Sequence, residues 1–230
     1  MSKCLWCKGT IEYSMSFSLL FYEQPTESRL CNGCRDSLSF VADEMYKCSS
    51  CCKLSDKDQC QDCLNWKQHY PNYPFKNESL FYYDTFAKEY MERYKILGDC
   101  ELSLLFSCEL RRYFKPKLKD SVIVPIPISY SSKVVRGFNQ VELLLESAEI
   151  PYITMLKNVG KGEKQAKKKR SERMNMNQPF ILDKDLISHI DGRSIIIVDD
   201  LYTTGRTLFH AADALKSCYS GNIQTFSLFR

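Results

Sequence analysis

Long apolar runs are missing from this chain of 230 residues. No stretch approaches the roughly 18 consecutive apolar residues that a membrane-spanning helix requires. The first nine residues, MSKCLWCKG, also lack the apolar core that follows the basic start of a secretory signal peptide. These absences argue against membrane insertion and predict a soluble, cytoplasmic protein. An apolar content of 44% is still ample for at least one buried core.

A strong charge of either sign is also missing. The formal net charge is only +4, which is too small to indicate nucleic acid as a partner. The segment 157–173 is a local exception, because it holds eight basic and two acidic residues. Three interpretations of it stay open: a solvated surface, a lid that closes on an active site, or a groove for a nucleic-acid backbone.

Cysteine, in contrast, is abundant. Twelve cysteines in a reducing compartment argue against a disulfide framework. Redox dithiols and buried thiols are alternatives, but C-x-x-C spacing lets two thiolates occupy adjacent corners of a tetrahedral Zn²⁺ site. Eight cysteines form four such pairs: Cys4/Cys7, Cys31/Cys34, Cys48/Cys51 and Cys60/Cys63. The four others are expected to pack in the interior: Cys52, Cys100, Cys108 and Cys218.

Four cysteine pairs predict two zinc ions, each bound by four thiolates. The natural pairing is sequential, joining the first pair with the second and the third with the fourth, although spacing leaves an interleaved pairing open. Because four thiolates leave no open position for water, both sites are expected to be structural. A domain this small needs its metal to fold, and residues 11–21 are rich in β-formers, as the hairpin of a zinc ribbon would be.

A change of composition marks a domain boundary after the last of these cysteines. Residues 69–77, HYPNYPFKN, carry two prolines and two asparagines, which interrupt helices and strands alike. We therefore expect a zinc-ribbon domain at 1–70 and a second domain at 78–230. In the second domain, apolar strands alternate with helical periodicity, which predicts an α/β fold with a parallel sheet flanked by helices. Strands are expected at 78–84, 122–127, 152–156, 194–200 and 224–229, and helices at 85–99, 100–113, 140–149 and 207–218.

The segment 195–207, IIIVDDLYTTGRT, carries the chemistry of the second domain. A buried strand ends on Asp199 and Asp200, and the small residues that follow lead into a helix. Unpaired amides at a helix start bind phosphate, and glycine allows close backbone approach. Carboxylates accept hydrogen bonds from vicinal hydroxyls, so a ribose 5-phosphate fits both halves of the segment. The alternative is an ordinary strand-to-helix turn with acidic residues.

The same segment resembles the phosphoribosyl pyrophosphate signature of type I phosphoribosyltransferases. Together with VPIP (124–127), RGFNQ (136–140) and the four cysteine pairs, it makes the chain similar to the ComF family. The resemblance implies a type I phosphoribosyltransferase-like α/β domain behind a Cys4 zinc-ribbon domain, and Mg²⁺ bound with the pyrophosphate. It also implies the ligand contacts: Asp199 and Asp200 to the ribose, Thr203, Thr204, Gly205, Arg206 and Thr207 to the 5-phosphate, and Ser129, Lys133 and Arg136 to the pyrophosphate.

The resemblance implies a role in natural transformation, in the uptake and handling of single-stranded DNA. The alternative is an active phosphoribosyltransferase whose acceptor is unknown, and no catalytic residue is assigned. Four tyrosines stand near basic residues and either stack on single-stranded bases or pack in the core: Tyr82, Tyr83, Tyr90 and Tyr94. The zinc-ribbon domain is a candidate surface for protein partners such as the competence helicase.

Overall fold

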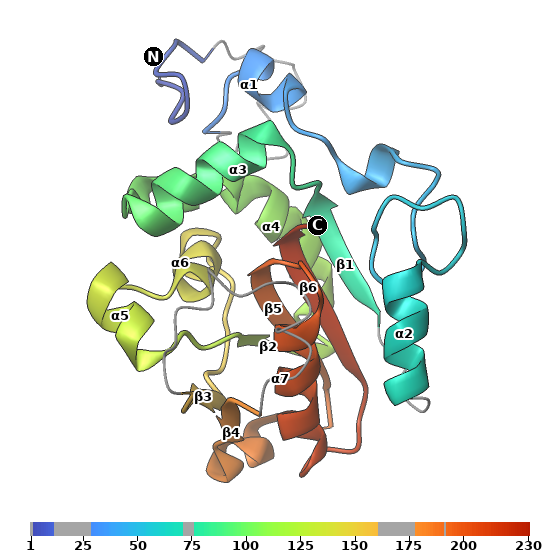
Figure 1. The fold of residues 1–230 in the computed structure, drawn as a ribbon. Helices are drawn as coiled ribbons and strands as arrows, with labels where there is room; N and C mark the ends of the chain where they lie inside the picture. The colour runs from blue at the N-terminus through green and yellow to red at the C-terminus, as the bar shows by residue number, and fades with distance from the viewer. Residues whose placement is uncertain (1, 12–28, 71–75, 161–177, 191) are drawn as a thin grey trace.

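A four-stranded parallel sheet forms the centre of the computed structural model, which describes residues 2–11, 29–70, 76–160, 178–190 and 192–230 (Figure 1). The strand order is β1-β6-β5-β2. The strands are β1 (Asn77–Phe81), β2 (Ser121–Pro125), β5 (Ser194–Leu201) and β6 (Ile223–Phe229). Four consecutive residues of β5, Ile195 to Val198, are buried, so this strand is covered on both faces. The predicted α/β fold with a parallel sheet is confirmed.

Helices cover the two faces of the sheet. Side chains alternate along β5, so that Ile196 and Val198 belong to one core and Ile195 and Ile197 to the other. The first core is completed by α3 (Thr85–Met91), the π-helical turn η3 (Glu92–Ile96), the 3₁₀ segment η4 (Cys100–Phe106), α4 (Ser107–Phe114) and α6 (Gln140–Ser147). The second core is covered by α7 (Arg206–Lys216) and the 3₁₀ segment η8 (Lys184–Ile190).

A small antiparallel pair of strands stands outside the main sheet. It consists of β3 (Leu156–Asn158) and β4 (Phe180–Leu182). The predicted strand at 152–156 is therefore wrong: Ile153 donates one backbone hydrogen bond to Ile123 of β2 at 2.9 Å, but strand pairing begins only at Leu156. The apolar residues there reflect burial in the second core rather than membership of the sheet.

The part of the chain before β1 contains short helices around the cysteines. These are α1 (Asn32–Asp36), the 3₁₀ turn η2 (Val41–Asp43) and α2 (Gln61–His69). The predicted hairpin at 11–21 lies, apart from Ile11, outside the described residues, and so do residues 71–75 of the expected boundary. The division into domains at 1–70 and 78–230 stays a prediction. No described helix combines the length and apolar character needed to cross a membrane.

Candidate functional site

The structure gathers the eight paired cysteines into two groups of four. Cys4, Cys7, Cys31 and Cys34 form the first group, and Cys48, Cys51, Cys60 and Cys63 form the second, with all sulfurs of a group within 4.8 Å of one another. Sulfur atoms lie 3.6 Å apart between Cys7 and Cys31 and 3.7 Å apart between Cys51 and Cys60. Zn–S bonds of about 2.3 Å give a tetrahedron with edges of roughly 3.8 Å. The groups follow the sequential pairing and fit zinc.

The two groups share the same local backbone structure. The amide of the first cysteine, Cys4 or Cys48, donates to the carbonyl five residues later at 2.8 Å. The residue after the second cysteine, Lys8 or Cys52, has a left-handed backbone with φ of 60° or 61°. The third cysteine occupies the N-cap position of a helix, with Cys31 preceding α1 and Cys60 preceding α2. We call residues 2–11 and 29–38 the first cysteine module and residues 47–69 the second.

The turn between β5 and α7 has a shape that only glycine permits. Gly205 has φ of 79°, and a Cβ built there would lie 2.3 Å from the hydroxyl oxygen of Tyr202. Thr203 and Thr207 are exposed, whereas Thr204 is buried. The amide of Arg206, the first of α7, donates to the hydroxyl oxygen of Thr204 at 3.4 Å. The next amides of α7 have no partner within the helix and carry its positive dipole end. This β5–α7 loop, residues Tyr202–Gly205, therefore has the features of an anion site.

The two carboxylates before this loop have different surroundings. Strand alternation turns Asp200 toward the first core and Asp199 toward the second. Asp200 is 2% exposed, and its Oδ2 lies 2.6 Å from the Nζ of Lys95, which η3 brings to the strand end. Burial and the neighbouring Asp200 charge raise the pKa of Asp199 to about 7. Joint contact of both carboxylates with one ribose stays a prediction.

The three candidate pyrophosphate residues lie on or beside α5 (Tyr130–Arg136). The hydroxyl of Ser129 caps this helix by accepting from the amide of Ser132 at 3.2 Å. Arg136 donates to the carbonyl of Lys95 at 3.2 Å and to the side chain of Gln140. Lys133 is exposed. The contact of Arg136 with Lys95 joins α5 to the ion pair at Asp200.

Arg206, the remaining candidate for phosphate contact, is directed along α7. Its Nε donates to Nε2 of His210 at 2.7 Å, and its guanidinium lies 5.8 Å from the ring centroid of Trp66. The side chain therefore contributes to the contact between α7 and α2. Its role in holding phosphate stays a prediction.

The structure assigns other contacts to some of the aromatic and basic residues that were candidates for binding nucleic acid. Tyr90 and Tyr94 are fully buried in the first core, so base stacking is wrong for these two and core packing is confirmed. Lys157 pairs with Asp183 at 2.8 Å, while residues 161–173 of the basic segment lie outside the described residues.

The prediction of interior packing is wrong for two of the four cysteines outside the C-x-x-C pairs. These two are exposed: Cys100 and Cys218.

Sequence reasoning missed several residues that hold the site together. Asn139 of the RGFNQ segment caps α6 by accepting from the amide of Val141 at 3.0 Å, and donates to the carbonyl of Ile126 at 3.1 Å. Its position before an apolar helical pattern was a usable capping signal. Trp66 and Arg230 contact the β5–α7 loop from distant parts of the chain, and periodicity holds no signal for such contacts.

The parallel sheet and the loop after its acidic strand end define a phosphoribosyltransferase fold, and comparison with known proteins agrees. The sequence profile described as "Phosphoribosyl transferase domain" matches residues 136–230. "Competence protein ComFC" of Streptococcus pneumoniae is 33% identical over 230 residues, covering 99% of this chain and 100% of that protein. "Competence protein ComFC" of Bacillus subtilis is 31% identical over 237 residues, covering 99% and 94%. The chain belongs to the ComF family of competence proteins.

Proposed function

We propose that this protein binds phosphoribosyl pyrophosphate at the β5–α7 loop. We also propose that it acts in the cytoplasm, where it takes part in handling single-stranded DNA during natural transformation. The observation that carries the first part is the loop itself. A glycine-dependent turn, exposed threonine hydroxyls and the start of α7 stand directly after two carboxylates at a strand end. Hydrogen-bond donors for a phosphate therefore lie beside carboxylates that can accept hydrogen bonds from hydroxyl groups. This combination matches a phosphorylated ribose.

Each part of the ligand would meet a different set of residues. The 5-phosphate would accept from the loop amides and from the hydroxyls of Thr203 and Thr207. The ribose hydroxyls would donate to Asp199 and to Asp200, whose ion pair with Lys95 would rearrange or be shared. The pyrophosphate, with Mg²⁺ as the hard cation on its oxygens, would lie toward α5. The residues proposed there are Ser129, Lys133 and Arg136.

The DNA-handling role rests on the relatives. Both similar proteins carry the name "Competence protein ComFC" and are matched over nearly their whole length. The basic segment 157–173 is the candidate for contact with single-stranded DNA, and the cysteine modules are the candidate surface for a helicase partner. The phosphoribosyl transferase domain match also supports a second function, the transfer of the phosphoribosyl group to an acceptor with release of pyrophosphate.

Calorimetric titration with phosphoribosyl pyrophosphate and Mg²⁺ tests the binding site. The wild-type protein should bind, and Asp199→Ala combined with Asp200→Ala should abolish binding while the zinc content stays unchanged. No heat of binding to the wild-type protein, or wild-type affinity in the double variant, would refute the proposed site. Pyrophosphate release in the presence of a panel of bases and nucleosides would favour the transferase function.

Binding to single-stranded oligonucleotides tests the second part. Backbone contacts by the basic segment predict an affinity that falls steeply as salt rises. A protein that binds phosphoribosyl pyrophosphate but shows no salt-dependent oligonucleotide binding would exclude direct DNA contact, leaving a role through protein partners.

A further inference from the structure

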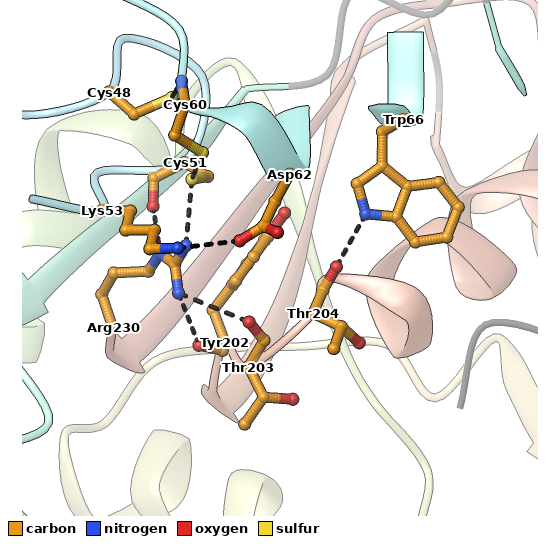
Figure 2. A network of polar contacts seen from close by, with 10 residues as sticks. All are labelled: Cys48, Cys51, Lys53, Cys60, Asp62, Trp66, Tyr202, Thr203, Thr204 and Arg230. Carbon is orange, nitrogen blue, oxygen red and sulfur yellow. Dashed lines mark hydrogen bonds and ion pairs between the residues drawn. The ribbon is translucent and has the colours of Figure 1, made fainter. Parts of the chain in front are cut away.

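The second cysteine module contacts the β5–α7 loop through a buried tryptophan. Nε1 of Trp66, on α2, donates a hydrogen bond to the carbonyl oxygen of Thr204 at 2.7 Å (Figure 2). The indole is 5% exposed and stacks on Phe209 of α7, with ring centroids 4.2 Å apart and planes 19° apart. One side chain thus holds both the loop backbone and the first turns of the following helix.

Arg230, which follows β6, makes a second connection between the same two parts. Its Nε donates to the carbonyl of Cys51 at 2.6 Å and its Nη2 lies 3.1 Å from the Sγ of Cys51. Its Nη1 donates to the carbonyl of Tyr202 at 3.2 Å, and the guanidinium lies 4.5 Å from the ring centroid of Tyr202 (Figure 2). The guanidinium group therefore bridges the loop and a cysteine of the candidate metal site.

These contacts orient the donors of the loop. A trans peptide is planar, so its N–H points opposite to its C=O. Holding the carbonyl of Tyr202 toward Arg230 turns the amide of Thr203 the other way, and holding the carbonyl of Thr204 toward Trp66 does the same for the amide of Gly205. Both amides then point away from the cysteine module. A rigid arrangement of donors binds an anion without the cost of ordering the loop at the moment of binding.

The first cysteine module makes different contacts. Trp6 packs on Phe86 of α3 with ring centroids 4.4 Å apart, and Arg35 pairs with Glu109 of α4 at 2.9 Å. The module adjoins the first core, on the other face of the sheet from α7. Trp6 and Arg35 therefore provide controls of matching chemistry that do not contact the loop through these interactions.

We propose that Trp66 and Arg230 are positioning residues of the ligand site, through which the second cysteine module and its metal set the affinity of the β5–α7 loop for its anionic ligand. This inference rests on the proposed binding of phosphoribosyl pyrophosphate, because that ligand defines the affinity in question. The contacts of Trp66 and Arg230 with the loop are present without the ligand.

The first experiment compares Trp66→Phe with Trp6→Phe. Each keeps an aromatic ring and removes an indole N–H, but only the first leaves the carbonyl of Thr204 without its donor. Titration with phosphoribosyl pyrophosphate and Mg²⁺ should give about tenfold weaker binding for Trp66→Phe and wild-type affinity for Trp6→Phe. Arg230→Met should weaken binding similarly, and Arg230→Lys should restore part of the loss. Wild-type affinity in both Trp66→Phe and Arg230→Met, with full zinc content, would overturn the proposal.

Hydrogen exchange without ligand separates failure of this proposal from failure of the proposed function. The amides of residues 203–207 should exchange faster in Trp66→Phe than in Trp6→Phe, and faster still after zinc is removed from the wild-type protein with a chelator. Absence of binding to the wild-type protein would refute the proposed function alone if this difference is present. Equal exchange in both variants would overturn the positioning role, whatever the ligand.

Discussion

The two cysteine modules have the same local construction but different neighbours. In both, the residue after the second cysteine has a left-handed backbone conformation, and the third cysteine precedes a helix. Of the four cysteines of the first module only Cys4 is buried, whereas all four cysteines of the second are buried. The first module packs on α3 and α4, and the second on the β5–α7 loop and α7.

The contrast between the two modules indicates that a group of four cysteines does not by itself define the role of a cysteine module. Zinc bound tetrahedrally by the four thiolates would stabilise the local fold in both cases. What each module supports is decided by the side chains that project from it. The modules adjoin opposite cores, and the strand end between those cores carries one acidic residue toward each. The candidate site therefore lies between the two cores, and the second module contacts the β5–α7 loop directly.

Removing the second metal site should have the largest effect. In Cys60→Ser combined with Cys63→Ser, we expect loss of one of two zinc ions, a marked drop in melting temperature, and at least about tenfold weaker binding of phosphoribosyl pyrophosphate. Cys7→Ser combined with Cys34→Ser should also lose one zinc ion but reduce affinity less. Metal analysis, thermal melting and calorimetry measure the three quantities. Equal losses of affinity would erase the distinction between the modules.

Breaking the ion pair on the side of the first core should come next. Lys95→Met leaves the buried Asp200 carboxylate without its cation and should lower the free energy of unfolding by about 3 kcal/mol. Adding Asp200→Asn to this variant should recover part of the loss, because the uncompensated charge is then gone. Urea denaturation of both variants provides the measurement. A loss below about 1 kcal/mol for Lys95→Met would mean that solvent already screens the pair.

A smaller effect is expected at the contact of the first module with α4. Arg35→Met removes the partner of Glu109, which is only 9% exposed, and should cost about 1–2 kcal/mol of stability. Affinity for phosphoribosyl pyrophosphate should stay at the wild-type value, in contrast to Arg230→Met, which removes a contact between the second module and the β5–α7 loop. Denaturation and calorimetry on the two arginine variants make the comparison direct. A parallel loss of affinity in Arg35→Met would contradict it.

A pH dependence due to Asp199 is also expected. Its pKa is raised from 3.8 to about 7 by burial and by the Asp200 charge. The folded protein therefore holds this proton more tightly than the unfolded chain. The contribution of protonated Asp199 to the free energy of unfolding is complete below about pH 3.8 and is lost as pH rises through about 7. Asp199→Asn should lack this loss and should melt higher than the wild-type protein at pH 8. Parallel curves of melting temperature against pH would contradict this.

Much of this architecture was predictable, because it depends on short-range patterns. Cysteine spacing predicted two groups of four, and apolar runs between helical segments predicted the parallel sheet. The strand predicted at 152–156 failed because burial and strand pairing produce similar apolar runs. The ion pair between Lys95 and Asp200 had no local signal, since the two residues lie 105 positions apart in the chain and meet only through folding.

The amino-acid sequence supplies the chemistry of this protein: cysteines in C-x-x-C pairs, an apolar run that ends in two carboxylates, and a glycine shortly after them. The way in which these parts are combined depends on the folded chain. Folding brought Trp66 to Thr204 and Arg230 to Cys51, contacts that join residues 138 and 179 positions apart. Patterns of spacing report local backbone geometry, whereas partners of buried polar groups are selected by the packing of the whole molecule.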